Sequence, residues 1–315
     1  MSLFDEIKWK EYHISSSAAY GVCSLSIGEV GEGSPCATIL AGVHGDEGPW
    51  GSIAIRYLLK DIEKKDLLGS LKVVPVANPL AMEADSRVSP IDNLDLNRVF
   101  PGDPKGSHTQ QIAAILVEHA LNCSDYVYDL HGGGSWCVNA FGFSFAGSED
   151  IVSSVSPPFI MDAQEKQGTL TGYSMKRGAK VTALEMGGRG RYENEWAKKI
   201  AYGLKKSLCD VGIIEKTQLH IEAPYRKVGP SMVLRSNMGG IFIPIIKEEI
   251  VGSVINRGTL MGKMVDPVTM NCIQELTAPF EATAVLLLRP HISVVNGGAM
   301  LYVVAPLKDE EIYIG

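Results

Sequence analysis

Hydrophobic and polar residues alternate over the first 215 positions in blocks that predict strands followed by helices. Short apolar runs at 37–40, 71–76 and 126–130 end in turns rich in glycine, proline or histidine. Between such runs, residues 50–64, 109–121 and 193–210 have the spacing of amphipathic helices. Strands that alternate with helices favour parallel neighbours covered on both faces. This part of the chain therefore predicts an α/β fold with a mixed, largely parallel sheet flanked by helices.

The pattern changes at about residue 216, where helical spacing stops. Short apolar runs then alternate with glycines, as in the stretches 232–246 and 292–306. Strands at intervals of about ten residues with glycine turns are typical of a small all-β module. We therefore expect an α/β domain at 1–220 and a β-rich C-terminal domain at 221–315.

Charge and hydropathy narrow the classes of protein to consider. The formal net charge is −7, so no basic excess is available to neutralise nucleic-acid phosphates. No window has the eighteen or more uninterrupted apolar residues of a membrane span, and the first twelve residues lack the apolar core of a secretory signal. We expect no nucleic-acid partner, no membrane span and a cytoplasmic location.

Two histidines and a glutamate form the first candidate site. His44 and Glu47 have two residues between them in a glycine-rich turn, and His131 follows the apolar run 126–130. Zinc binds neutral imidazole and carboxylate groups, and a catalytic site uses three protein ligands and leaves one position open. Asp129 shares a strand face with His131 and could orient its imidazole as a carboxylate partner. Taken alone, His44 could equally be a capping or surface residue.

Two further polar clusters have both a functional and a structural interpretation. Arg87, Asn97 and Arg98 lie in a long irregular stretch, where guanidinium groups could bind a carboxylate or an oxyanion, or simply face solvent. Glu185 follows the apolar pair Ala183–Leu184 and lies just before a double glycine. It could act as a helix cap or as a general base.

Together, these clusters resemble the succinylglutamate desuccinylase/aspartoacylase family, relatives of the zinc carboxypeptidases. The segments that carry the resemblance are His44–Glu47, Asp95–Arg98 (DLNR), Asp129–Gly133 (DLHGG) and Leu184–Gly188 (LEMGG), which occur in the order of the family's motifs. The tail at about 228–306 looks like the β-rich module of a bacterial deacylase branch, which is similar to a biotinyl/lipoyl half-barrel. The resemblance implies a zinc-carboxypeptidase-like catalytic domain at 1–220.

The resemblance also implies roles for single residues. His44, Glu47 and His131 would hold one Zn²⁺ per chain, and Glu185 would be the catalytic base. Arg87 would polarise the scissile carbonyl, while Asn97 and Arg98 would grip a substrate carboxylate. Arg177, eight residues before Glu185, is a further candidate for substrate binding, with a surface salt bridge as the alternative. The implied activity is hydrolysis of the amide bond of an N-acyl amino acid or a related small N-acyl compound.

Other functions remain open at this level. A zinc metallocarboxypeptidase acting on peptides would use the same residues on the same scaffold. A non-catalytic metabolite-binding protein would be expected to have lost a ligand or the base, and all four residues are present. A homo-oligomer is compatible with the sequence.

Overall fold

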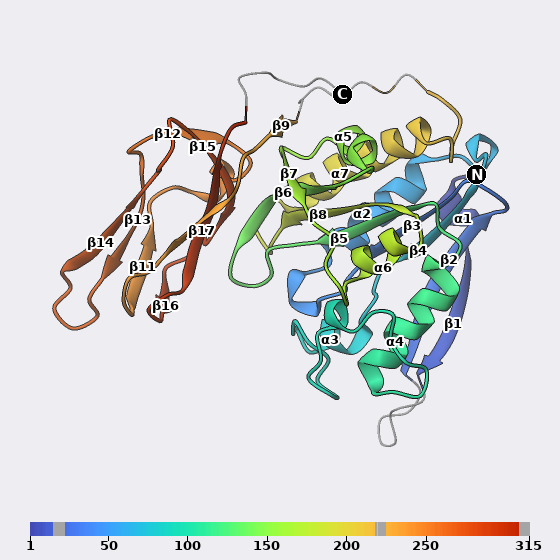
Figure 1. The fold of residues 1–315 in the computed structure, drawn as a ribbon, viewed down its shortest axis with the longest axis horizontal. Helices are drawn as coiled ribbons and strands as arrows, with labels where there is room; N and C mark the ends of the chain where they lie inside the picture. The colour runs from blue at the N-terminus through green and yellow to red at the C-terminus, as the bar shows by residue number, and fades with distance from the viewer. Residues whose placement is uncertain (15–22, 218, 220–224, 309–315) are drawn as a thin grey trace.

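The computed structural model describes residues 1–14, 23–217, 219 and 225–308. These residues form a large sheet with helices on both faces and a smaller sheet at one end (Figure 1). The N-terminal elements are α1 (Leu3–Glu6), β1 (Lys8–Ile14), β2 (Cys23–Gly31), β3 (Cys36–Ala41), η1 (Gly45–Glu47), α2 (Trp50–Asp61), η2 (Lys64–Asp66), β4 (Ser70–Val74), α3 (Pro79–Glu83), η3 (Leu96–Arg98), α4 (His108–Leu116) and η4 (Val117–Leu121).

The chain continues through the second half of the α/β part into the C-terminal strands. These elements are β5 (Tyr126–His131), β6 (Val138–Phe145), α5 (Glu149–Val155), β7 (Phe159–Ala163), α6 (Leu170–Lys176), β8 (Lys180–Gly187), α7 (Glu193–Asp210), β9 (Arg226–Lys227), β10 (Met232–Arg235), β11 (Gly240–Pro244), η5 (Glu248–Ile250), β12 (Val254–Asn256), β13 (Leu260–Val265), β14 (Cys272–Thr277), β15 (Ala282–Leu288), β16 (Ser293–Val295) and β17 (Met300–Pro306).

The large sheet is mixed, as the sequence predicts, but parallel pairing dominates only at its centre. Its main order is β1-β2-β4-β3-β5-β8-β6-β15-β17-β10. The strands β4, β3, β5 and β8 are parallel neighbours, whereas β1, β2, β15, β17 and β10 join through antiparallel ladders. Parallel neighbours need a crossover, which α2 and α4 supply, while the outer strands have antiparallel partners and need none. The expectation of a largely parallel sheet is therefore wrong for the outer strands.

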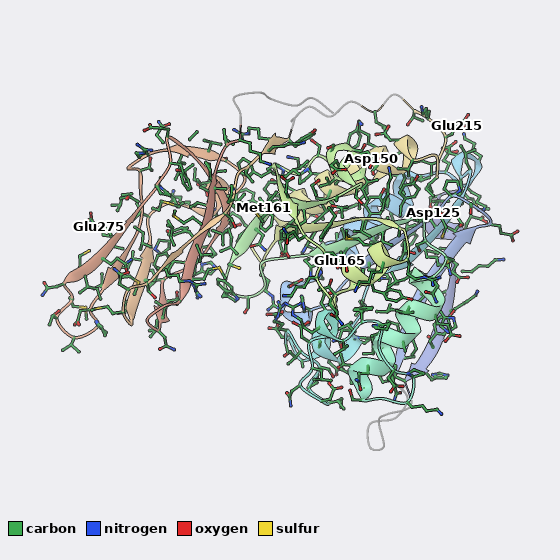
Figure 2. All side chains as sticks on the ribbon, viewed as in Figure 1. Asp125, Asp150, Met161, Glu165, Glu215 and Glu275 are labelled. Carbon is green, nitrogen blue, oxygen red and sulfur yellow. The ribbon has the colours of Figure 1, made fainter. Side chains whose placement is uncertain are left out.

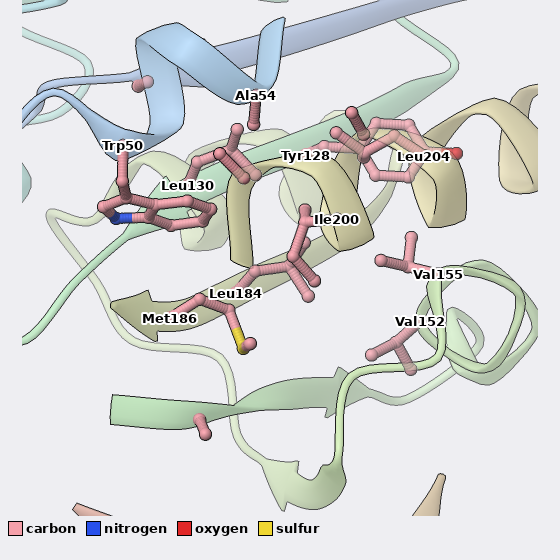
Figure 3. Close-up of a cluster of buried hydrophobic side chains, with 14 of the residues drawn as sticks. Trp50, Ala54, Tyr128, Leu130, Val152, Val155, Leu184, Met186, Ile200 and Leu204 are labelled. Carbon is pink, nitrogen blue, oxygen red and sulfur yellow. The ribbon is translucent and has the colours of Figure 1, made fainter. Parts of the chain in front are cut away.

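Helices cover both faces, and the predicted helical segments are confirmed. α2, α5 and α7 pack on one face, where Trp50, Leu130, Leu184 and Ile200 meet in the hydrophobic core (Figure 3). α4 and α6 cover the other face, which carries a second cluster of buried side chains. Because side chains alternate along a strand, placing Leu130 in the first core turns His131 toward the second face. The functional site lies on that face.

The C-terminal strands extend the large sheet instead of forming a wholly separate unit. β15 pairs with β6, with Leu287 opposite Asn139, and Met161 of β7 lies where the two regions meet (Figure 2). β14, β13, β11 and β16 form the second, antiparallel sheet. The predicted boundary at 220/221 falls outside the described residues, and the division into two domains stays a prediction. Among the described residues, no helix is long and apolar enough to cross a membrane.

Candidate functional site

The polar clusters of the sequence meet at the carboxyl ends of the central strands. His44 follows β3 and Glu47 ends η1, while His131 is the last residue of β5. Glu185 lies on β8 directly opposite His131 in the parallel register. This edge is where functional residues of open α/β sheets collect. The pairing brings His131 and Glu185 together although they lie 54 positions apart in the sequence.

His44, Glu47 and His131 form a compact, buried group. Their ligand atoms all lie within 4.8 Å of one another. Nδ1 of His44 is 2.6 Å from Oε1 of Glu47, and Nδ1 of His131 is 3.0 Å from its Oε2. Two imidazole nitrogens and a carboxylate that converge in this way are the ligand set of a catalytic zinc site. The donor chemistry and the burial therefore fit a metal ion.

Glycines make this close approach of backbone segments feasible. A Cβ on Gly45 would lie 2.0 Å from the backbone of Ala81, so only glycine lets η1 pack against α3. A Cβ on Gly132 would lie 2.7 Å from Nε1 of Trp50. The amide of Gly132 instead donates a hydrogen bond to Oε2 of Glu47. The tight turns beside both histidines therefore have a packing reason for their glycines.

Electrostatics keep the glutamate of this group ionised. Burial raises the pKa of Glu47, but the charges and hydrogen bonds of His131 and His44 outweigh burial, and its pKa falls well below the usual value. Burial lowers the pKa of both histidines, yet their carboxylate neighbours raise it to a net value above normal. Glu47 is thus ionised and can bind a cation, whereas protons compete with a metal ion for the two imidazoles.

The second nitrogen of each imidazole faces another carboxylate. Nε2 of His131 is 2.9 Å from Oδ2 of Asp129, as the same-face argument predicts. Nε2 of His44 is 3.0 Å from Oδ1 of Asp95, a partner that the sequence analysis missed. Such carboxylates fix the ring orientation of metal-binding histidines and raise their basicity. Both rings are therefore held with Nδ1 directed at Glu47.

Replacing Asp95 with asparagine should weaken metal binding without changing the three ligand side chains. The amide keeps the shape of the side chain but loses the negative charge beside His44, so we expect a roughly 10- to 100-fold lower metal affinity. Competition with a chelator of known affinity measures this. Asp92→Asn is a control from the same loop, because Asp92 accepts hydrogen bonds from Thr109 and is not the carboxylate beside His44. Equal affinities for Asp95→Asn and the wild type would contradict a role for Asp95.

Glu185 also lines the cavity beside the histidines, but it is not part of the converging group of His44, Glu47 and His131. Its Oε2 accepts a hydrogen bond of 2.9 Å from Nδ2 of Asn139. Burial raises the pKa of Glu185 to about 7, with the charge of His131 opposing and that of Glu47 adding to the shift. A carboxylate with a pKa near neutrality can both accept and release a proton.

The loop before α4 brings the predicted arginines and Asn97 to the same place. One guanidinium nitrogen of Arg87 is 3.6 Å from Oε1 of Glu47, and the other is 3.2 Å from Oδ2 of Asp95. Oδ1 of Asn97 accepts from the amide of Leu170, which leaves its Nδ2 3.4 Å from Nε2 of His131. Arg98 is exposed and donates to the carbonyl of Asn97. All three line the cavity that contains the histidines.

Arg177 is the one predicted site residue that the structure does not bring here. It is exposed at the C-terminal end of α6, before β8 begins at Lys180. Glu185 lies near the other end of that strand, and a strand rises about 3.3 Å per residue. Arg177 is accordingly absent from the described residues that line the cavity.

The cavity has a volume of about 570 Å³, and several of its walls could not be read from the sequence. Asn139 lies inside an apolar strand, and Trp136 lies in the loop after β5. Arg289 of the C-terminal region stacks on the Trp136 ring, with 4.6 Å from its guanidinium carbon to the ring centroid. Leu287 of β15 also lines the cavity. The C-terminal strands therefore contribute to the wall of the site.

Comparison with known proteins decides the family. Residues 34–209 match the model of the succinylglutamate desuccinylase/aspartoacylase catalytic domain. The chain belongs to this family. A curated relative, the N-alpha-acetyl-L-2,4-diaminobutyric acid deacetylase of Halomonas elongata, is 26% identical over 327 aligned residues, which cover 94% of this chain and 89% of the relative.

Solved structures in the succinylglutamate desuccinylase/aspartoacylase family share the fold along nearly the whole chain. The succinylglutamate desuccinylase/aspartoacylase from Rhodobacter sphaeroides has a TM-score of 0.81 at 24% identity and 98% coverage of both chains. The ectoine utilization protein EutE (DoeB) from Ruegeria pomeroyi, in a product-bound structure, has a TM-score of 0.81 at 24% identity and 95% coverage of both chains. The mixed α/β sheet and the small C-terminal sheet are thus features of this fold.

Family membership and geometry together make the protein an enzyme, an amidohydrolase of the deacylase type. Its buried His44, Glu47 and His131 could hold a metal ion. The resemblance seen in the motifs is therefore confirmed.

Proposed function

We propose that this family member is a zinc-dependent deacylase that hydrolyses the amide bond of a small N-acyl amino acid. The observation that carries the proposal is the convergence of a buried His44–Glu47–His131 group and a separate carboxylate, Glu185, on one cavity. Two imidazoles and one carboxylate leave an open position on a tetrahedral zinc ion. When bound there, zinc would polarise a carbonyl and acidify water.

Glu185 is the proposed general base. It faces the cavity beside His131 but is not one of the three converging ligands, and Asn139 fixes one of its oxygens. It would take a proton from the attacking water and deliver it to the leaving amine. The pKa of about 7 in the metal-free protein would fall beside a divalent cation, which favours the ionised form that accepts the proton.

Arg87 is the proposed partner of the negative charge that develops on the carbonyl oxygen. Its guanidinium is about half exposed and already adjoins Glu47 and Asp95, so it reaches the cavity side of the metal group. Asn97 and Arg98 would bind the substrate carboxylate, because the amide nitrogen of Asn97 is directed into the cavity by the Leu170 contact. Anchoring that carboxylate would place the amide in register with Glu185.

Replacing Arg87 with alanine should lower kcat by about 10²–10³-fold, the usual cost of losing one donor to an oxyanion. Metal content should stay near the wild-type level, because the three ligands remain. Steady-state kinetics with metal analysis on the same samples measures both. Arg56→Ala is a matched control, since Arg56 is an exposed residue of α2 near Phe4. A rise in KM with unchanged kcat would assign Arg87 to ground-state binding instead.

The similar deacetylase from Halomonas elongata supports a small N-acyl amino acid as the substrate class. A zinc metallocarboxypeptidase remains the second candidate, because a zinc-carboxypeptidase-like catalytic domain at 1–220 would use the same ligands. We assign the region 221–315 to a β-rich, biotinyl/lipoyl-like domain that closes one side of the cavity through Leu287.

Hydrolysis of a panel of N-acyl amino acids, run beside dipeptides and tripeptides, tests the proposal. Turnover of N-acyl amino acids without cleavage of peptides supports the deacylase. The reverse pattern would assign the site to a peptidase.

A further inference from the structure

The floor of the cavity lies one row of residues below the metal group and has a different chemistry. In the sheet, His131 lies opposite Glu185, and Asp129 lies opposite Ala183 two residues earlier along the same strands. Phe143 of β6 is opposite Ala183 on the other side. Because residues two apart share a strand face, the side chains of Ala183 and Phe143 point to the same face as His131 and Glu185.

A second pair of residues extends this floor. Phe145 of β6 is opposite Ala163 of β7, and the rings of Phe143 and Phe145 are 6.3 Å apart. Phe143, Phe145, Ala163 and Ala183 all line the cavity; we refer to these four as the floor residues. The two alanines leave space that a larger side chain would fill, and the two phenylalanines surround it with apolar surface.

The cations of the cavity lie elsewhere. Arg87 and Lys166 belong to loops and Arg98 ends η3, and all three are exposed at the rim. Asp129 lies opposite Ala183 of the floor, and its carboxylate, 2.9 Å from Nε2 of His131, carries the same sign as an acidic substrate group. A carboxylate placed on the floor would therefore lose its hydration among apolar atoms without gaining a cation. A hydrocarbon group placed there would be favoured.

We infer that the floor residues form a subsite for an uncharged hydrocarbon group of the substrate, which makes the enzyme a deacylase of apolar N-acyl amino acids. This inference rests on the proposed function. The hydrocarbon group could be the side chain of the amino acid or the chain of the acyl group, and both would bury against the same four residues. Arg98 at the rim then binds the α-carboxylate, while Arg87 keeps its proposed role at the carbonyl oxygen.

The test compares substrates that place hydrocarbon or charge on either side of the amide. N-acetylnorleucine and N-acetylaspartate vary the amino acid, and N-hexanoylglycine and N-acetylglycine vary the acyl group. We expect kcat/KM to be roughly tenfold or more higher for N-acetylnorleucine than for N-acetylaspartate, or for N-hexanoylglycine than for N-acetylglycine. The pair that shows the preference identifies the source of the hydrocarbon group.

Ala183→Val fills part of the floor and should lower kcat/KM roughly tenfold for the preferred apolar substrate while changing N-acetylglycine much less. Ala140→Val is the matched control. Ala140 is a buried alanine of β6 in the core on the opposite face of the sheet, so its enlargement should affect both substrates equally. If Ala183→Val fails to fold, Ala163→Val tests the same space from β7.

Calorimetry of the products norleucine, aspartate and hexanoate tests the hydrocarbon subsite separately from the deacylase activity. Tighter binding of norleucine or hexanoate than of aspartate, with no turnover of any amide, would overturn the deacylase and support the subsite. Faster turnover of N-acetylaspartate than of both apolar substrates would support the deacylase and overturn the subsite. An equal effect of Ala183→Val on small and apolar substrates would also overturn it.

Discussion

Replacing Glu185 with glutamine is expected to lower kcat by about 10²–10⁴-fold, the usual range for loss of a general acid–base group. The amide has the size of the carboxylate and can still contact Asn139, which holds Oε2 in the wild type. It cannot accept a proton from water at neutral pH. Because Glu185 is outside the converging ligand group, the metal content should be unchanged. Steady-state kinetics and metal analysis on one preparation measure both quantities.

Glu195→Gln is a control with the same chemical change, since Glu195 is an exposed residue of α7. It should leave both kcat and metal content at the wild-type level. Activity of Glu185→Gln within tenfold of the wild type would remove Glu185 from the proton transfer.

Replacing His131 with alanine is expected to abolish stoichiometric metal binding and reduce turnover to background. The substitution removes one of three converging ligands and leaves Glu47 and Asp129 as neighbouring buried anions without their shared partner. That loss should also destabilise the fold, by about 3–5 kcal/mol for a broken buried ion pair. Circular dichroism therefore accompanies the metal analysis, and only a folded variant is compared.

Metal binding should also weaken as the pH falls. The carboxylate neighbours raise the pKa of His44 and His131 in the metal-free protein, so these imidazoles hold protons at a higher pH than free histidine. A metal ion must displace those protons, and its apparent affinity therefore decreases toward acid pH.

His291→Ala is the control for His131→Ala, because His291 is exposed in the C-terminal region. Retention of stoichiometric metal by folded His131→Ala would contradict the ligand assignment.

The sequence predicts the parts of the site that depend on local pattern. His131 ends an apolar run and Glu185 lies in another, so parallel strands were sufficient to suggest that they share an edge. The period of two along β5 correctly placed Asp129 beside His131. The helices α2, α4 and α7 follow from their 3.6-residue spacing, since one face of each packs on the sheet.

Features that depend on long-range contacts were not accessible in this way. Asp95 contacts His44 because the loop before α4 folds back over η1, where the carbonyl of Ser86 accepts from the amides of Gly45 and Asp46. No periodicity encodes that path. The closeness of Arg177 and Glu185 in the sequence was misleading, because Arg177 precedes the start of β8 and Glu185 lies near its end.

The pairing of β15 with β6 has the same origin. Both strands are rich in apolar, buried residues, but nothing in either pattern specifies the strand with which it pairs. The contribution of Leu287 to the cavity wall depends on that pairing.

The most direct test of the central claim is turnover of the N-acyl amino acid panel by one preparation before chelation, after chelation and after return of zinc. We expect about one zinc ion per chain, loss of turnover with its removal, and recovery in proportion to the zinc bound. Full turnover by protein free of metal would contradict it.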